Sequence, residues 1–265
     1  MRNRVLKEYD ARSRMRFRIR IFILGGALLI LLVLIVYILI ESPLLRINKI
    51  EITGNNQTPQ SDISQYLYSR ILNSRFSYFL GFYNFLSWPN RIGENNLALL
   101  PTIKQIDISK DYLRHVLVAN VVERQPSGVW CFEKDGSPNC FWFDSEGIIF
   151  KKAFATSGNL VFSIDDYAQN IIPTGGKILP DSFLPNFFSI MQLLNDANLN
   201  IKEIRLNDLN LEEIEVDLNS GPKIYFSLRF DPSNDLSVIN YLRQNKNFNN
   251  LQYIDFRSEN KAFYK

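Results

Sequence analysis

Residues 21–40 read IFILGGALLILLVLIVYILI and contain no charged side chain. A helix of this length rises about 30 Å, which matches the hydrocarbon thickness of a bilayer. A cleaved signal peptide has a shorter apolar region and small residues at its cleavage site, whereas this run ends in Glu41-Ser42-Pro43-Leu44. The sequence therefore predicts a retained transmembrane helix over residues 21–41.

Charge is distributed unevenly around this segment. Residues 1–20 carry eight basic side chains against Glu8 and Asp10, so that 22 of the 30 basic and 25 of the 27 acidic residues lie elsewhere. The basic flank predicts a cytoplasmic tail over residues 1–20 and export of the chain beyond residue 41. Because the exported part is mildly acidic, it lacks the basic surface that a nucleic-acid partner requires.

Two cysteines, Cys131 and Cys140, lie in the exported part, where oxidising conditions allow them to bond. They flank FEKDGSPN, and a two-residue turn at Asp135-Gly136 predicts a hairpin in which they face each other at a non-hydrogen-bonded position. A disulfide is feasible in that geometry. A four-residue loop would change the register and leave two partly buried thiols instead.

The exported part begins with a strand, two helices and two strands. Alternation, capping residues and helical spacing place these elements at residues 47–55, after Thr58-Pro59, at 89–100, at 103–111 and at 115–125. Beyond Gly128 the pattern is mostly strands with two helices, which predicts an antiparallel sheet with flanking helices. The chain is therefore expected to be an α+β protein.

The aromatic run between Phe76 and Trp88 has two interpretations. Its rings are expected to form the core side of the helices, because these helices otherwise lack apolar residues to cover their strands. The alternative is that the rings enter the interface of the nearby membrane.

No feature of the sequence indicates catalysis. His115 is the only histidine and opens a buried-looking strand, and with the two distant cysteines it cannot supply a four-ligand metal site. Asp144 and Glu146 fit a turn between strands, and Asp165-Asp166 fits a solvated loop. We therefore expect a binding protein without cofactor or metal, and not an enzyme.

The ordered combination of parts resembles the FtsQ/DivIB family of bacterial cell-division proteins. The basic tail, single span and first exported unit lead into VVERQPSGVW, in which Glu123, Arg124 and Pro126 match a Glu-Arg-x-Pro segment of that family. The chain also resembles the family in three further segments, NKIEITGN, FDSEGIIF and the terminal LQYIDFRSENKAFYK. The resemblance implies a POTRA domain over residues 44–124 and a β-domain over residues 125–265.

That resemblance implies a divisome scaffold in the cell membrane at the division septum. Such a protein recruits small single-span coiled-coil partners of the FtsB/DivIC and FtsL types and helps control the septal peptidoglycan synthase. The partner would add a strand to the last sheet edge, at the residues that correspond here to Tyr253, Asp255, Arg257, Lys261, Ala262, Phe263 and Tyr264.

Several alternatives stay open at this stage. Glu123 and Arg124 are expected to lock the domain junction or to face a partner, and otherwise are two solvated charges at a strand end. Pro126 is expected to stop strand pairing, and Gly128 to let the chain turn. Lys261 could instead protect an edge from aggregation. A POTRA-type chaperone or translocation module that binds extended polypeptides is the competing function.

The chain departs from the family pattern in two places. The cysteine pair is not part of that pattern, and the glycine that often follows the strand in FSLRFDPSNDL is missing.

Overall fold

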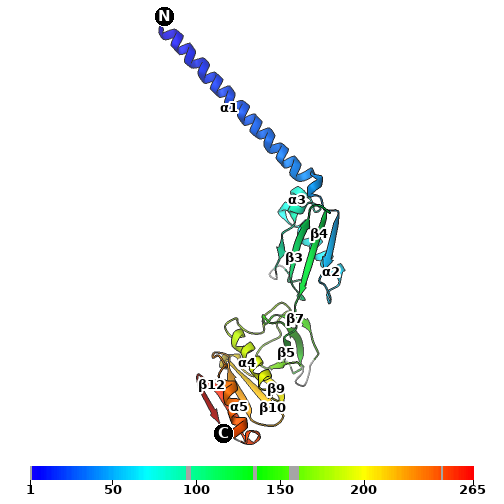
Figure 1. The fold of residues 1–265 in the computed structure, drawn as a ribbon, viewed down its shortest axis with the longest axis vertical. Coiled ribbons are helices and arrows are strands. Elements are labelled where there is room, and N and C mark those ends of the chain that lie inside the picture. Colours follow the sequence, from blue (N-terminus) through cyan, green and yellow to red (C-terminus); the bar gives the residue numbers. More distant parts are fainter. Residues whose placement is uncertain (1, 94–96, 134–135, 155–160, 246) are drawn as a thin grey trace. The chain divides into compact units, whose positions relative to one another are not determined.

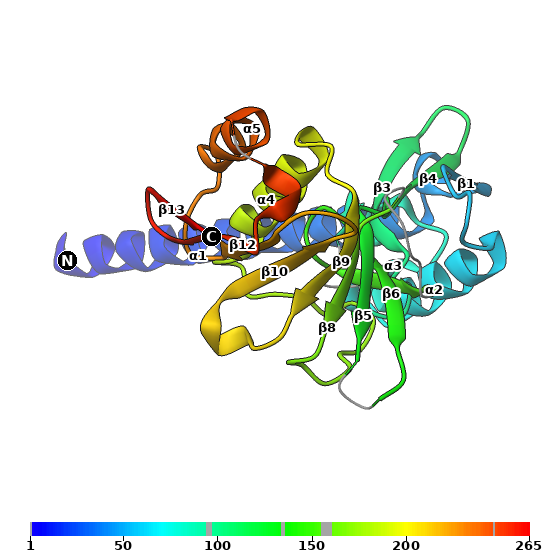
Figure 2. The same ribbon diagram turned by 90° about the horizontal axis from the view of Figure 1, so that it is seen from below.

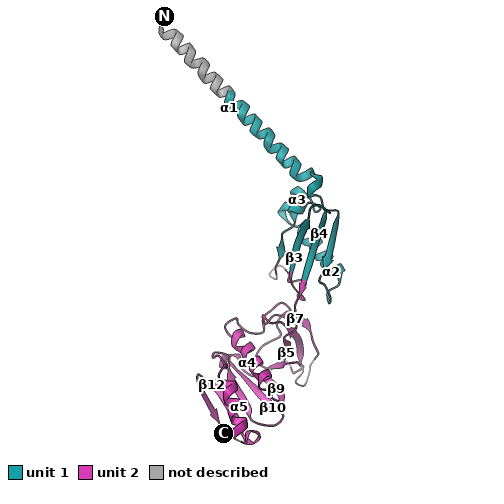
Figure 3. Cartoon of the chain, viewed as in Figure 1, with its two compact units in different colours: residues 1–92, 106–121 teal, residues 93–105, 122–265 magenta. Residues whose placement is uncertain are grey.

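The computed structural model describes residues 2–265 apart from 94–96, 134–135, 155–160 and 246, with side chains from residue 20 onward. The chain divides into two compact units (Figure 3). Unit 1 comprises Met1–Ile92 and Ile106–Val121, and unit 2 comprises Gly93–Gln105 and Val122–Lys265. The fold is α+β, as the sequence predicts.

The first element is the long helix α1, Arg2–Glu41, followed by the short 3₁₀ turn η1, Pro43–Leu45 (Figure 1). Its segment Arg20–Glu41 is long and apolar enough to cross a membrane, and its large apolar side chains are exposed. No other helix among the described residues meets that criterion. A helix that exposes apolar side chains all round is the form that a lipid environment accommodates.

A four-stranded sheet in the order β1-β4-β3-β2 follows, with β1 parallel to β4. The elements are β1 Lys49–Thr53, α2 Gln60–Leu72, α3 Arg75–Leu80, η2 Phe85–Ser87, β2 Arg91–Ile92, β3 Ile103–Asp111 and β4 Val116–Glu123. The predicted strands at β1, β3 and β4 and the first helix are confirmed. The prediction of a helix over residues 89–100 is wrong where the structure describes it, because Arg91 and Ile92 pair with β3. The second helix lies earlier and is capped by Ser74, whose hydroxyl accepts from Ser77 N at 3.2 Å.

The aromatic run of unit 1 divides between core and surface. Phe82, Phe85 and Trp88 are buried, and Trp88 Nε1 donates to Phe82 O at 2.9 Å. Phe76 and Phe79 on α3 are instead exposed. The prediction of a core role is thus correct for Phe82, Phe85 and Trp88 and wrong for Phe76, Tyr78, Phe79 and Tyr83, since α3 buries Ser77 and leaves its rings exposed.

Unit 2 contains a nine-stranded sheet in the order β13-β12-β11-β10-β9-β8-β5-β6-β7. Its strands are β5 Gly128–Phe132, β6 Asn139–Phe143, β7 Ile149–Lys152, β8 Ser163–Asp166, β9 Ile201–Leu206, β10 Glu213–Leu218, β11 Lys223–Ser227, β12 Tyr253–Ser258 and β13 Lys261–Tyr264. Two short 3₁₀ turns, η4 Leu209–Leu211 and η5 Phe248–Asn250, lie in its connections.

The prediction of an antiparallel sheet is wrong, because the sheet is mixed. β8 runs parallel to β5 and β9, and β12 runs parallel to β11. Parallel neighbours need a long crossover connection. The helices α4, Leu184–Asp196, and α5, Asp235–Asn245, lie in two of these connections and pack on the same face of the sheet (Figure 2).

Asp165 and Asp166 do not form a solvated loop, because they end strand β8. Asp166 is fully buried and accepts from Trp130 Nε1 at 2.9 Å and from Gln169 Nε2 at 2.8 Å. These donors satisfy the carboxylate where water is absent. The buried indole of Trp130 explains why an acidic residue occurs at this core position.

Cys131 and Cys140 face each other on β5 and β6 and form a disulfide. Their pairing is the one that a two-residue turn at Asp135-Gly136 predicts, although Lys134 and Asp135 lie outside the described residues. Val129 packs beside the bond on the same side of the sheet.

Replacing both cysteines with alanine is expected to destabilise unit 2. The two cysteines are nine positions apart. In the chain-entropy account, a disulfide that closes a loop of this length stabilises the folded state by about 2–3 kcal/mol, because it restricts the unfolded chain. Urea denaturation of the full chain in detergent measures the loss, and reduced wild-type protein is the matched control. Equal midpoints for the oxidised wild type and the variant would contradict the expectation.

Candidate partner-binding edge and chain junction

The last two strands form one end of the nine-stranded sheet. β13 follows β12 through a turn at Glu259 and Asn260, and Asn260 adopts a φ of 57°, which asparagine tolerates better than most residues. All seven residues that the resemblance assigns to partner binding lie on these two strands. The structure therefore brings the whole predicted set together.

Hydrogen bonding in the strand pair defines which backbone groups face outward. Tyr253 and Lys265 exchange bonds, with N···O distances of 3.4 and 3.2 Å, and Asp255 opposes Phe263. In an antiparallel pair, hydrogen-bonded and non-bonded positions alternate. Tyr264 therefore occupies a non-bonded position, and its N–H and C=O point away from β12. In the described chain no strand pairs with that outer edge.

Side chains on β13 alternate between the two faces of the sheet. Ala262 packs against the core that α4 and α5 cover, and Phe263 lies on the opposite face with Asp255. Phe263 and Tyr264 are 52% and 46% exposed. Lys261 is exposed as well. The edge thus combines available backbone groups with half-exposed aromatic rings.

Arg257 organises the neighbouring strand. Its guanidinium donates to both carboxylate oxygens of Asp255, at 2.7 and 2.9 Å, and to Glu213 Oε2 at 2.8 Å. It also lies 4.7 Å from the ring centroid of Tyr225, within cation–π range. The hydrogen bonds from Arg257 hold the pKa of Asp255 below its usual value. These contacts hold the side chains of Asp255 and Arg257 in place on β12, next to the free edge of β13.

Residues in register with Phe263 form a polar row across the open face of the sheet. The row runs from the edge inward through Phe263, Asp255, Tyr225, Glu215, Arg205 and Asp165. Strand alternation places each residue on a face, but the order of the row depends on long-range pairing. Tyr225, Glu215 and Arg205 therefore could not be assigned to this row from the sequence.

Arg205 pairs with Glu215 of this row and with Asp217 beside it on β10. It donates to Glu215 at 2.7 Å and to Asp217 at 2.5 Å, and Lys223 lies 2.6 Å from Glu215. Partial burial of Glu215 opposes ionisation, yet bonds from Lys223 and the charge of Arg205 hold its pKa below the usual value. Burial, with the nearby charges of Glu203 and Glu133, raises the pKa of Asp165 to about 6.

The residues predicted to form the domain junction, Glu123, Arg124 and Pro126, differ in their burial. Glu123 and Arg124 are buried, which excludes the alternative of two solvated charges, whereas Pro126 is exposed between β4 and β5. Gly128 is needed for close packing and not for a turn, because a Cβ there would lie 2.6 Å from the Phe143 ring.

Arg124 forms a buried ion pair with Asp144 in unit 2. Asp144 also accepts from the backbone N–H groups of Glu146 and Ile148, at 2.9 and 3.0 Å. The expected turn between strands at Asp144 and Glu146 is confirmed. The Asp144 carboxylate binds both the backbone of this turn and the Arg124 guanidinium. This pairing is not visible in the sequence, because the two residues are twenty positions apart.

A hollow of about 170 Å³ lies between the β12–β13 turn and the start of α5. Asp231 and Asp235 both line it, as do Ser258, Glu259 and Asn260 of the turn. Burial, with the negative charge of Asp231, raises the pKa of Asp235 to about 7. The acid that begins α5 is therefore partly protonated near neutrality.

Substituting Arg124 tests the buried pair. Arg124→Met keeps an apolar stem but leaves the Asp144 carboxylate buried without its cation, which is expected to cost about 3 kcal/mol. The matched control is Lys104→Met, because the Lys104–Glu146 pair is more than a third exposed on both sides and such pairs contribute about 1 kcal/mol or less. Equal losses of unfolding free energy in urea titrations would contradict this account.

The raised pKa of Asp235 predicts a pH-dependent stability. Between about pH 4 and 7 the folded state binds a proton that the unfolded state has released, so the stability contributed by this group falls as pH rises. Asp235→Asn should therefore raise the urea midpoint relative to wild type at pH 8 and have little effect at pH 4. Asp231→Asn should shrink the pH dependence. If the urea midpoints of Asp235→Asn and wild type differed by the same amount at pH 4 and pH 8, the raised pKa of Asp235 would be contradicted.

Among the described residues, no group of three or more His, Cys, Asp or Glu side chains could hold a metal ion. No protein-family model matches the chain, and no curated protein matches it.

Proposed function

We propose that the protein is a non-enzymatic, single-pass divisome scaffold of the FtsQ/DivIB type. In this proposal the unit built on the four-stranded sheet is a POTRA domain and the nine-stranded unit is the β-domain. The scaffold recruits small coiled-coil membrane proteins of the FtsB/DivIC and FtsL types and helps control septal peptidoglycan synthesis during cell division.

The free edge of β13 is the observation that carries the proposal. Exposed sheet edges are liabilities that proteins usually cover or guard, so an edge with half-exposed Phe263 and Tyr264 suits a partner. An extended partner segment would bond to the outward N–H and C=O of Tyr264 and extend the sheet. Main-chain bonds would supply affinity, and side chains on alternate faces would supply selectivity.

The element order gives a second line of support. The elements of the four-stranded sheet follow the strand–helix–helix–strand–strand order that the resemblance implies, with the short strand β2 added before β3, and β1 and β4 lie side by side. One helix could span a membrane before this unit. The proposed topology has the basic tail in the cytoplasm, both units outside and the protein at the septum.

The competing proposal is a POTRA-type chaperone or translocation module. It relies on the same β13 edge, because backbone pairing accepts an extended polypeptide of almost any sequence. The two proposals differ in the partner: a scaffold retains a few specific membrane proteins, and a chaperone retains many polypeptides.

Substitutions at Tyr264 separate backbone pairing from side-chain contact. Tyr264→Pro removes the outward N–H without removing a bond to β12, and proline is tolerated on edge strands. Tyr264→Ala keeps the N–H and removes only the ring. We expect Tyr264→Pro to abolish capture of small coiled-coil membrane proteins from solubilised membranes, and Tyr264→Ala to retain most of it.

Circular dichroism and urea denaturation of each variant confirm that the fold is intact before capture is compared by mass spectrometry. Equal capture by wild type and Tyr264→Pro would place the partner elsewhere. Capture of many unrelated polypeptides, lost in Tyr264→Pro, would favour the chaperone.

A further inference from the structure

Unit 1 exposes large apolar side chains on α3. Phe76, Tyr78 and Phe79 are 70%, 85% and 72% exposed, although buried Ser77 between them anchors the helix through bonds to the preceding turn. Three adjacent rings in water are unusual for a surface helix, since scattered single residues are the norm. Their exposure is not explained by the core of the unit.

Two further apolar residues belong to the same end of unit 1. Leu113, at the tip of the β3–β4 turn, is 94% exposed, and Leu44 follows α1 directly and is also exposed. The turn is tied to the start of the exported chain, because His115 Nδ1 lies 3.0 Å from Arg46 O and Asn48 N donates to His115 O at 2.8 Å.

The turn that presents Leu113 is held by its own hydrogen bonds. Asp111 Oδ1 accepts from the backbone N–H groups of Leu113 and Arg114, at 3.1 and 3.0 Å. The apolar side chain is therefore presented outward by an ordered turn.

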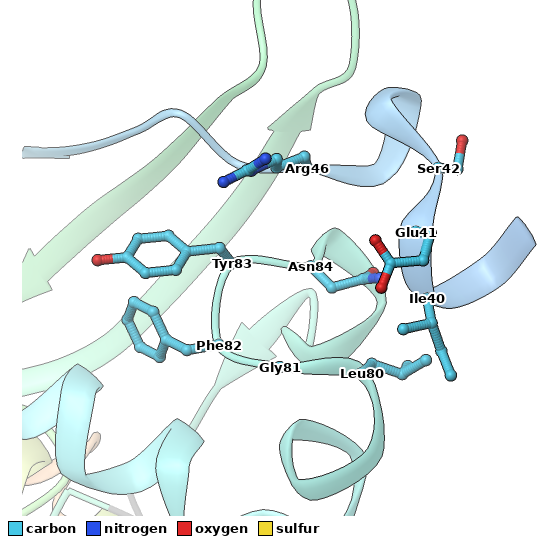
Figure 4. A pocket seen from close by; sticks show the side chains of 9 residues that line it. All are labelled: Ile40, Glu41, Ser42, Arg46, Leu80, Gly81, Phe82, Tyr83 and Asn84. Atoms are coloured by element: carbon cyan, nitrogen blue, oxygen red, sulfur yellow. The ribbon is translucent and has the colours of Figure 1, made fainter. Parts of the chain in front are cut away.

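This end of unit 1 is continuous with the end of the apolar helix. The side chain of Asn84, itself buried, donates to Leu39 O at 2.7 Å, inside the last turn of α1. Figure 4 shows Asn84 directed toward the end of α1, with Leu80 of α3 beside Ile40. Ile40, Glu41, Leu80 and Asn84 line one hollow of about 290 Å³. The exposed rings of α3 therefore lie next to the point where α1 would leave the hydrocarbon.

Exposed cations accompany the apolar residues. Arg75 begins α3 directly before Phe76, and Arg46 lines the hollow at the end of α1. Aromatic rings and arginines together are typical of the headgroup level of a membrane, where the rings enter the interface and the cations meet lipid phosphates.

We propose that Leu44, Phe76, Tyr78, Phe79 and Leu113 form a lipid-docking patch that lies in the outer interface of the membrane that α1 crosses. The patch holds unit 1 against the lipid surface in addition to the covalent anchor. This inference rests on the membrane-spanning role of α1 in the proposed function and adds a second, peripheral contact to it. The interpretation of the aromatic run as a membrane contact thus applies to its first half.

Spin labels on the full chain, reconstituted in phosphatidylcholine–phosphatidylglycerol vesicles, test the patch. Because both native cysteines are joined, a single introduced cysteine carries the label. Phe79→Cys and Leu113→Cys probe the patch, Leu32→Cys probes the middle of the apolar segment Arg20–Glu41, and Ser61→Cys at the exposed start of α2 is the aqueous control. Oxygen partitions into lipid and a water-soluble nickel chelate does not, so the ratio of their relaxation effects reports depth.

We expect the oxygen-to-nickel ratio at residues 79 and 113 to lie several-fold above that at residue 61 and below that at residue 32. A ratio at residues 79 and 113 equal to that at residue 61, with residue 32 in lipid, would overturn the docking patch and leave the membrane anchor intact. Shielding of residue 79 from both reagents would indicate a protein contact, such as a second copy, and would also overturn it. An aqueous residue 32 would overturn the spanning role itself.

Discussion

A row of buried apolar residues across the nine-stranded sheet determines how the rest of unit 2 is built. The row has one residue from each of six adjacent strands, paired in register, and every one of them faces α4 and α5. These residues are Trp130, Ile164, Ile204, Val216, Ile224 and Ile254. Because side chains alternate along a strand, a slip of one residue in any pair would move an apolar side chain into water. This row therefore fixes the register, and the register fixes which residues occupy the open face.

The same register defines the candidate edge. Once Ile254 lies in the core, Tyr253, Asp255 and Arg257 must face the opposite side, and Tyr264 must turn its backbone groups outward. The ion pairs of Arg257 and Arg205 then order the open face without covering the edge. Affinity for an extended partner would come from the backbone of β13, whereas choice of partner would depend on the side chains around it.

Unit 1 and unit 2 use their aromatic residues for different purposes. In unit 2, Trp130, Phe143 and Phe187 contact one another inside the core. In unit 1, Phe82, Phe85 and Trp88 serve the core, and the rings of α3 remain outside it next to the end of α1. An anchor, a lipid-docking patch and an open sheet edge would together suit a scaffold that presents one edge from the membrane surface.

Local patterns in the sequence by themselves determined the apolar helix, most strands, the helices α2, α4 and α5, and the facing cysteines. These features depend on periodicity and turns over a few residues. Only the tertiary structure decided that the sheet is mixed, that Arg124 pairs with Asp144, and that the aromatic run divides between core and surface. It also ordered the row from Phe263 to Asp165. The physical reason is that each of these outcomes depends on contacts between residues distant in sequence, whose partners are set by packing of the whole unit.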